Sequence, residues 1–497
     1  MTITLTDQDK ATLRTAAYGA VSLLAAAGGK AHKIATAGTT ALYSATGPVG
    51  HVLAAKSKDI DLRGKTVAEL ADQVLPALTA AMALLGKQDP AEAGNFRSTV
   101  LVAIEAATQQ YRDEPGLAAM TGKITGALDA PVPNTVAGQE RPELQQLIEE
   151  IVETGFVGLS MRVNDEQGEW VGSAGVSRLG ETAAPPIDGH VRIGSNTKTF
   201  TATLVLQLVA EGKIELDTPV VDYLPEFELD QRITVRMLLQ HTSGVFNHTG
   251  EHFEDGTFAA GIAWGGKEWV ENRFKTYQPE ELVRLALSKP ARFEPGTDWS
   301  YANTNYVLAR LLIEKVTGRS FRAEMQRLII GPLGLSGTVA PTTQTELPEP
   351  HAYAFYRYEE CGEEKTLDVT SSNPSWISSG GDMISTTQDL HIFISALVGG
   401  KLLPPALLDE MFTPETKVGY GLGVFVQETA AGTIISHNGG HGGHAALMYS
   451  MADGSKTVTA AVNYVDDADL SGALTFQQAT QRVVDEVLGG GQTEPAA

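Results

Sequence analysis

The stretch Gly194-Ser-Asn-Thr-Lys-Thr-Phe200 opens an apolar helical run that ends at Gly212. Ser195 and Lys198 are three residues apart, so on a helix the serine hydroxyl lies one turn from the lysine ammonium. Near a helix N-terminus and beside a cation, a serine alkoxide and an amine that gives up its proton both form more easily. Ser-x-x-Lys is nevertheless a frequent pattern, and taken alone a capping serine with a solvated lysine is the simpler explanation.

Two later stretches carry further side chains of catalytic type. Tyr301 and Asn303 are two residues apart in a turn-rich segment, so a phenol and an amide can project from one loop into the same cleft. The stretch Ile435-Ser-His-Asn-Gly-Gly-His-Gly-Gly-His444 is rich in glycine at a predicted strand edge. Glycines at such an edge allow the backbone of a substrate to approach closely.

The charge of the chain excludes nucleic acid as a partner. The 497 residues carry a net charge of -23, and residues 1–130 contain 12 basic and 12 acidic side chains. All of the excess negative charge therefore lies on residues 131–497. Binding to phosphates requires a field of the opposite sign.

The lack of a membrane span and of a secretory signal predicts a cytoplasmic protein. No cofactor is expected. No apolar run approaches the roughly 18 residues that a membrane span requires, and the N-terminus lacks the basic region of a secretory signal. Cys361 is the only cysteine, so no intramolecular disulfide can form. It lies next to Glu359 and Glu360, where a thiolate is disfavoured, and we expect it to be inert.

Residues 1–130 are predicted to form an all-α bundle that is rich in alanine. Helices are expected near 7–27, 31–55, 66–87, 90–111 and 115–128. The bundle contains no pattern typical of catalysis, so we expect a structural role or association with itself or with another protein. A linker rich in proline is predicted at 131–142, and residues 489–497 are predicted to be disordered.

Residues 143–488 are predicted to form an α+β domain. A helix at 143–153 precedes strands at 156–163 and 169–176, and further strands are expected at 419–426, 432–436, 445–451 and 457–463 before a final helix at 467–487. The two ends of this segment therefore share one antiparallel sheet flanked by helices, with a mostly helical insert between them.

With these motifs in this order, the chain resembles the serine penicillin-recognising superfamily. That superfamily comprises class C β-lactamases, serine D-Ala-D-Ala carboxypeptidases, and related esterases and D-aminopeptidases. It carries Ser-x-x-Lys, Tyr-x-Asn and then Lys-Thr-Gly or His-x-Gly, which match Ser195-x-x-Lys198, Tyr301-x-Asn303 and His437-x-Gly439 here. The segments 238–244, 293–296, 331–335 and 378–390 look like further landmarks of the family.

The resemblance implies a β-lactamase/penicillin-binding-type fold and a role for each matching residue. Ser195 is implied as the nucleophile, Lys198 as its activating partner and Tyr301 as the group that passes protons between the nucleophile and the leaving group. Substrate-binding roles are implied for Asn303, for His437, which replaces the usual lysine, and for the strand edge at Gly439 and Gly440. The N–H groups of Ser195 and Gly440 would form the oxyanion hole.

Some side chains leave two interpretations open. Trp376 is as consistent with a wall of the substrate cleft as with a core residue. His437, His441 and His444 could form a metal site, but the glycines between them predict a flexible segment without an acidic or cysteine partner, so no metal site is expected. His241 is expected to be a structural turn residue. No Gly-x-Ser-x-Gly occurs, which argues against an α/β-hydrolase.

The region of the third motif narrows the expected substrate. Between Lys417 and Lys456 the sequence contains no Lys or Arg, so a free carboxylate would be held poorly unless His441 or His444 replaced the missing cation. An esterase, amidase or D-aminopeptidase acting on a small acyl or peptide substrate is therefore favoured over a D-Ala-D-Ala carboxypeptidase or a β-lactamase. An acyl transferase or peptide cyclase remains open, as does a penicillin-binding-like protein without turnover whose helical domain mediates interactions.

Overall fold

The computed structural model describes residues 5, 7–43, 47–55, 60, 62, 66–88, 90–109, 115–129, 141–253, 256–414, 418–469 and 471–489. The chain divides into two compact units, residues 1–135 and 136–497. The division falls within the segment 131–142 that was predicted as a linker, of which residues 131–140 lie outside the described residues. The predicted disordered tail also lies outside them, apart from residue 489.

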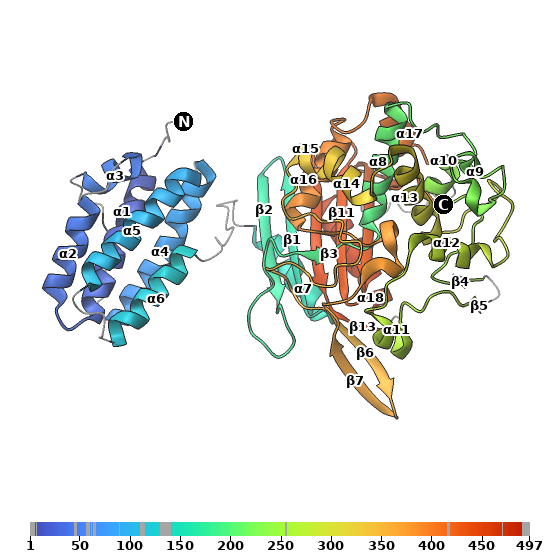
Figure 1. Cartoon of the computed structure of the whole chain (residues 1–497). Helices are drawn as coiled ribbons and strands as arrows, with labels where there is room; N and C mark the ends of the chain where they lie inside the picture. Colours follow the sequence, from blue (N-terminus) through green and yellow to red (C-terminus); the bar gives the residue numbers. More distant parts are fainter. Residues whose placement is uncertain are drawn as a thin grey trace. The chain divides into compact units, whose positions relative to one another are not determined.

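The N-terminal unit is helical, as predicted, and has a hydrophobic core of its own (Figure 1). Fully buried side chains such as Leu13, Phe96 and Ile124 form this core. Its helices are α1 (Asp7–Ala27), α2 (Ala31–Tyr43), α3 (Gly47–Ala54), α4 (Val67–Gln88), α5 (Pro90–Thr108) and α6 (Pro115–Asp129).

The single helix predicted at 31–55 is wrong, because α2 ends at Tyr43 and a separate helix α3 begins at Gly47. Pro48 explains the second start. Proline lacks the backbone N–H that a helix interior needs, but it fits the first turn, where that N–H has no partner inside the helix.

The second unit is built on a six-stranded antiparallel sheet with the strand order β2-β1-β12-β11-β10-β9. The strands are β1 (Gly158–Asp165), β2 (Gly168–Gly175), β9 (Phe425–Thr429), β10 (Gly432–His441), β11 (His444–Met451) and β12 (Thr457–Asn463). β1 pairs with β12 from Gly158↔Asn463 to Asn164↔Thr457. The prediction that the two ends of the domain share one antiparallel sheet is therefore confirmed.

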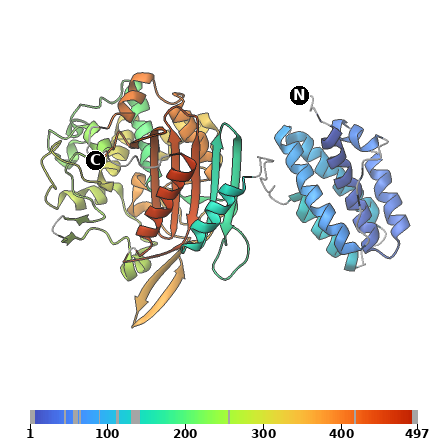
Figure 2. The same ribbon diagram turned by 180° about the vertical axis from the view of Figure 1, so that it is seen from behind.

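Helices cover both faces of this sheet. On one face lie α7 (Pro142–Glu153) and α18 (Ala473–Val487), which cross the strands in Figure 2. α7 packs through Leu144, Leu147, Ile148 and Ile151, whose spacing of three and four residues places them on one side of the helix. The opposite face is covered by α8 (Asn196–Ala210) and α16 (Thr387–Val398), within the largest core of the unit.

The insert between β2 and β9 is mostly helical, as predicted. Its other helices are α9 (Val220–Tyr223), α10 (Val235–Gln240), α11 (Gly266–Asn272), α12 (Pro279–Leu287), α13 (Asn303–Thr317), α14 (Phe321–Met325), α15 (Gly331–Leu333) and α17 (Pro405–Phe412). Short strands pair within it as β3 (Val191–Arg192) with β8 (Ile384–Ser385) and as β4 (Glu251–His252) with β5 (Phe258–Ala259). β6 (Phe355–Glu360) and β7 (Glu363–Asp368) form a hairpin that projects from the unit (Figure 1), with the exposed Cys361 in its turn.

Three sequence-based boundaries near the C-terminus are wrong. The strand expected at 419–426 is instead a turn, since Gly419 and Gly423 adopt positive φ angles of 70° and 80°, and β9 begins only at Phe425. The helix expected from 467 begins at Ala473, because Val465–Asp467 forms strand β13 beside β6. β10 continues to His441, so Gly439 and Gly440 belong to a regular strand rather than to a flexible segment, and Gly442 and Gly443 form the turn to β11.

Candidate active site

Ser195 stands at the N-terminus of α8, which is fastened to the sheet. The Asn196 side chain donates to the carbonyl oxygens of Ile193, at 2.8 Å, and of Ala446 on β11, at 3.0 Å. Ser195 is partly exposed, whereas every residue from Asn196 to Leu206 is buried. The fold therefore presents the serine hydroxyl at the surface of a rigid, buried helix.

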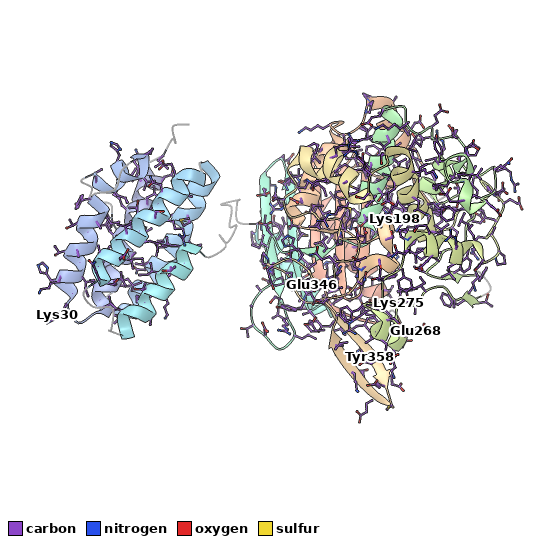
Figure 3. All side chains as sticks on the ribbon, viewed as in Figure 1. Lys30, Lys198, Glu268, Lys275, Glu346 and Tyr358 are labelled. Carbon is purple, nitrogen blue, oxygen red and sulfur yellow. The ribbon has the colours of Figure 1, made fainter. Side chains whose placement is uncertain are left out.

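Lys198 lies in the interior of the second unit (Figure 3) and is completely buried. Its Nζ is 3.1 Å from Ser195 Oγ, 2.7 Å from Asn303 Oδ1 and 2.6 Å from the carbonyl oxygen of Gly380. Burial lowers the Lys198 pKa well below its ordinary value. A neutral amine has two N–H groups, and here two carbonyl oxygens accept them. Its lone pair then remains for the Ser195 O–H, which is the arrangement of a general base.

Tyr301 is the third side chain of the candidate site, beside Ser195 and Lys198. Burial raises the pKa of its phenol well above the ordinary value, with a smaller opposing effect of the Ser195 side chain, so the phenol keeps its proton at rest. Lys198 Nζ lies 4.6 Å from the centre of the Tyr301 ring. The resting site thus combines a neutral phenol with an amine whose charged form is disfavoured, and the amine is the base that is available first.

Asn303 is the first residue of α13 and holds Lys198 in place. Besides the contact of its Oδ1 with Lys198, its Nδ2 donates to Thr249 Oγ1 at 3.1 Å, and its backbone N–H donates to Asn247 Oδ1 at 3.0 Å. An amide nitrogen has two N–H groups. Among the described residues only one has a partner, so the second is the group that could meet a substrate carbonyl.

The edge of β10 next to Ser195 is open. β9 pairs with β10 only from Gly432 to Ser436, so within the described residues no strand lies beside 437–441 on that side. His441 and His444 close the two-residue turn to β11, which makes them a hydrogen-bonded pair, and the pairing type then alternates along the strand. The N–H and C=O of Gly440 consequently point away from β11, toward the open edge.

The backbones of α8 and β10 come into contact at the glycines of the third motif. A Cβ added to Gly194 would lie 2.6 Å from the Gly440 nitrogen, and one added to Gly439 would lie 2.2 Å from the Ser195 nitrogen. The N–H groups of Ser195 and Gly440 are thus brought side by side. Two adjacent donors of this kind can bind a developing oxyanion.

The contact at Gly439 makes this residue intolerant of a side chain. We expect Gly439→Ala to lower the free energy of unfolding of the second unit by about 1–3 kcal/mol, because the extra methyl group meets backbone atoms that cannot rotate away. Urea unfolding followed by fluorescence measures this. Gly440→Ala is the matched control, since a Cβ there meets nothing closer than 3.7 Å. Equal stability of the two variants would contradict the close approach.

His437 is buried on β10, just before these glycines in the strand, and Tyr420 lies beside its ring. Its Nδ1 lies 2.7 Å from the carbonyl oxygen of Asn438, and its Nε2 lies 3.2 Å from the Tyr420 hydroxyl. Burial, with a smaller effect of Lys198, lowers the pKa of His437 to about 3. His437 is therefore a neutral imidazole with both nitrogens engaged inside the protein, and its role in substrate binding stays a prediction.

The remaining candidate residues lie around this edge. The partly exposed Trp376 has its ring 5.5 Å from that of His441. His441 Nε2 is 3.3 Å from Ser372 Oγ, and His444 Nε2 is 3.0 Å from the carbonyl oxygen of Ala352. Among the described residues no three His, Cys, Asp or Glu side chains are grouped so as to hold a metal ion.

His241 is a turn residue, as expected, but it also supports Tyr301. It ends α10 in the left-handed region at φ 62° and is completely buried. Its Nδ1 accepts the backbone N–H of Ala302 at 3.2 Å, and its ring lies 4.3 Å from the Tyr301 ring. His241 thereby fixes the start of α13 and one face of the Tyr301 ring.

Sequence reasoning missed two groups in the site, namely the Gly380 carbonyl that binds Lys198 and the hydroxyl of Tyr420. Gly380 lies in a segment, 378–390, that looked like a family landmark without an assigned role. Tyr420 lies in a stretch whose alternating glycines were interpreted as a strand. Only the glycine spacing at 419, 421 and 423 could have indicated a turn there.

The chain is similar to enzymes and to penicillin-binding proteins that share this fold. A D-stereospecific amidohydrolase from Streptomyces sp. is 36% identical with a TM-score of 0.61, over 70% of this chain and 99% of that structure. A penicillin-binding protein of Bacillus subtilis (strain 168) is 26% identical over 64% of this chain and 69% of its own length. Esterase EstB of Burkholderia gladioli is 33% identical over 30% of this chain and 38% of its own length.

The family model described as Beta-lactamase matches residues 144–480, which contain the whole sheet and all three motifs. The N-terminal helical unit lies outside this match. In the described part of the chain, no helix has the length and apolar character needed to cross a membrane. The match over most of the chain, together with the shared fold, shows that this chain belongs to the beta-lactamase family of serine hydrolases.

Proposed function

We propose that this protein hydrolyses a small ester, amide or D-amino-acid-containing peptide through an acyl-enzyme on Ser195. The observation that carries the proposal is the buried Lys198, whose Nζ lies 3.1 Å from Ser195 Oγ while two carbonyl oxygens bind its N–H groups. An amine held in this way has its lone pair directed at the serine hydroxyl. It can remove the proton without first having to reorganise.

The proposed reaction has two halves. Ser195 Oγ attacks the substrate carbonyl and its proton passes to Lys198, while the N–H groups of Ser195 and Gly440 bind the oxyanion. The intermediate collapses with loss of the alcohol or amine, which takes a proton from Tyr301 as Tyr301 is reprotonated from Lys198. Water then attacks the ester on Ser195 and gives a proton to the Lys198 and Tyr301 pair. The bond between the acyl carbon and Ser195 Oγ breaks, the pair passes that proton back to Oγ, and the free acid leaves.

The electrostatics of the third motif favour substrates without a free carboxylate. His437 is neutral, and a carboxylate beside it would lack the charge-assisted hydrogen bond that a lysine supplies. Burial lowers the pKa of His441, and the nearby Arg192 adds a smaller effect. Arg192 is 1% exposed and its Nη2 donates to the carbonyl oxygens of Thr345, at 2.6 Å, and Ser372, at 3.0 Å, so its charge is directed into the protein rather than to a substrate. The similar Streptomyces amidohydrolase and the Burkholderia esterase also support amides and esters as substrates.

We expect wild-type protein to hydrolyse nitrophenyl esters or D-amino-acid nitroanilides with a kcat/KM at least about tenfold above that for D-Ala-D-Ala peptides, because a missing charged hydrogen bond costs about 1.5–3 kcal/mol. A panel of these compounds and nitrocefin, assayed at equal enzyme concentration, measures this. Amidation of the peptide carboxylate should raise kcat/KM toward the value for the other amides. A preference for the free carboxylate would contradict the substrate assignment and support a carboxypeptidase.

Labelling separates turnover from binding. A fluorophosphonate or a fluorescent penicillin, followed by mass spectrometry, identifies the acylated residue. A stable label on Ser195 without hydrolysis of any panel member would support a penicillin-binding-like protein whose helical unit is the functional module. Transfer of the acyl group to an added amine in place of water would support an acyl transferase or cyclase, since only the acceptor differs.

A further inference from the structure

Tyr420 lies in the turn before β9 and is completely buried. Its ring is 5.1 Å from that of His241, 6.4 Å from that of Tyr301 and 4.7 Å from that of Phe425. The backbone around it is also fixed, because the Gly423 carbonyl accepts the Thr199 hydroxyl of α8 at 2.8 Å. The Tyr420 side chain is therefore held rigidly behind the catalytic group.

The contacts of His437 determine which of its nitrogens carries the proton. The carbonyl oxygen of Asn438, 2.7 Å from Nδ1, can only accept a hydrogen bond, so Nδ1 carries the proton. A neutral imidazole has one N–H, so Nε2 is an acceptor. The Tyr420 hydroxyl, 3.2 Å from Nε2, must then donate to it.

The Asn438 carbonyl belongs to the open edge of β10. Asn438 pairs with Leu447 two positions before the Gly440↔Ala445 pair, so its backbone groups point in the same direction as those of Gly440. A carbonyl on an open edge would otherwise take its hydrogen bond from water or from a substrate. The Nδ1–H of His437 donates to this carbonyl from within the protein. The N–H and C=O of Gly440 are then the next backbone groups along the edge that can bind a substrate.

We propose that Tyr420 is a positioning residue for acyl transfer: its hydroxyl fixes the Nδ1–H form of His437, and His437 in turn holds the β10 edge at Asn438 so that Gly440 faces Ser195. This inference rests on the proposed function, because it assigns Gly440 to the oxyanion hole. Tyr420 touches neither substrate nor nucleophile and acts through His437. It accounts for a tyrosine hydroxyl that is buried against a buried imidazole.

Tyr420→Phe removes one oxygen atom and keeps the ring. We expect kcat for the best ester of the panel to fall about 10- to 10²-fold, as expected for a misplaced catalytic donor, with KM changed by less than about twofold. Tyr356→Phe is the matched control: Tyr356 is 1% exposed and its hydroxyl accepts the Gly266 N–H at 2.6 Å, but it lies outside the active site. This control should keep the wild-type kcat.

Nitrogen NMR of protein labelled in histidine tests the same inference without catalysis. In wild-type protein the His437 signals, identified by their loss in His437→Ala, should show a protonated Nδ1 and an Nε2 that accepts a hydrogen bond. In Tyr420→Phe the Nε2 signal should move to the position of an acceptor without a donor. A protonated Nε2 in the wild type, or an Nε2 signal that Tyr420→Phe leaves in place, would overturn the proposal.

A double-mutant cycle separates positioning from general loss of structure. In a His437→Ala background the hydroxyl of Tyr420 has no imidazole to bind, so Tyr420→Phe should cause no further loss of kcat. Independent, additive losses would overturn the proposal, as would a kcat of Tyr420→Phe equal to that of Tyr356→Phe. If the wild type hydrolysed none of the panel, the proposed function would fail, whereas the protonation state of His437 would still report on Tyr420.

Discussion

Replacing Ser195 with alanine is expected to lower hydrolysis of the best panel substrate by about 10⁴- to 10⁶-fold, the range seen when a serine hydrolase loses its nucleophile. The reason is that no other hydroxyl occupies its place. Lys198 Nζ lies 3.1 Å from Ser195 Oγ, and burial raises the pKa of Tyr301 against a smaller opposing effect of the Ser195 side chain. The same change should abolish covalent labelling by a fluorophosphonate, measured as the mass of the intact protein.

Ser173 on β2 provides the matched control for this experiment. It is a serine of the same unit on the outermost strand at the opposite side of the sheet from β9, and Ser173→Ala should leave both labelling and hydrolysis unchanged. Undiminished hydrolysis by Ser195→Ala would show that the catalytic centre lies elsewhere. The three motifs would then not mark the catalytic centre of this protein.

Replacing Lys198 with methionine is the second change with a large expected effect. Methionine fills a similar volume without an amine, so the site should remain packed while the base is lost. We expect the rate of acylation to fall at least about 10²-fold, the usual contribution of a general base. The rate of fluorophosphonate labelling, followed in rapidly quenched samples, measures acylation directly. Lys213→Met, which removes an exposed lysine paired with Glu211 just beyond the same helix, should label at the wild-type rate.

The pH dependence of labelling tests the protonation state assigned to Lys198. Burial lowers its pKa well below the ordinary 10.5, so the neutral amine is the main form already far below that pH. Acylation should accordingly be fast at neutral pH and should fall only as the pH drops through the lowered pKa, where the amine takes up a proton. Lys198→Met should lack this acid limb. A wild-type rate that keeps rising up to a pH near 10.5 would contradict the assignment.

Much of the site could be predicted from the sequence because its parts are local patterns. The three-residue spacing of Ser195 and Lys198, followed by an apolar run, predicts a hydroxyl and an amine on one helical face. The structure has α8 in that position. The strand at 457–463 was predicted with the bounds that β12 has. Alternation and helical periodicity depend only on neighbouring residues, so they can be read without knowledge of the fold.

Other elements depend on partners that are distant in the sequence. The final helix was expected to begin at residue 467. Val465–Asp467 instead pairs with β6, which lies about a hundred residues earlier in the chain. The stretch around Tyr420 alternates like a strand, yet it folds as a turn that packs against α8. In both cases tertiary contacts outweigh a weak local preference.

The sequence by itself determined the nucleophile motif, the order of the three motifs, the helical N-terminal unit and the sheet shared by the two ends of the catalytic domain. Only the tertiary structure decided that Lys198 is buried between Asn303 and Gly380, and that His437 is buried with its Nε2 against the Tyr420 hydroxyl. The reason is physical. Secondary structure follows from spacing along the chain, whereas a pKa and a hydrogen-bond partner follow from burial and from groups that only folding brings together.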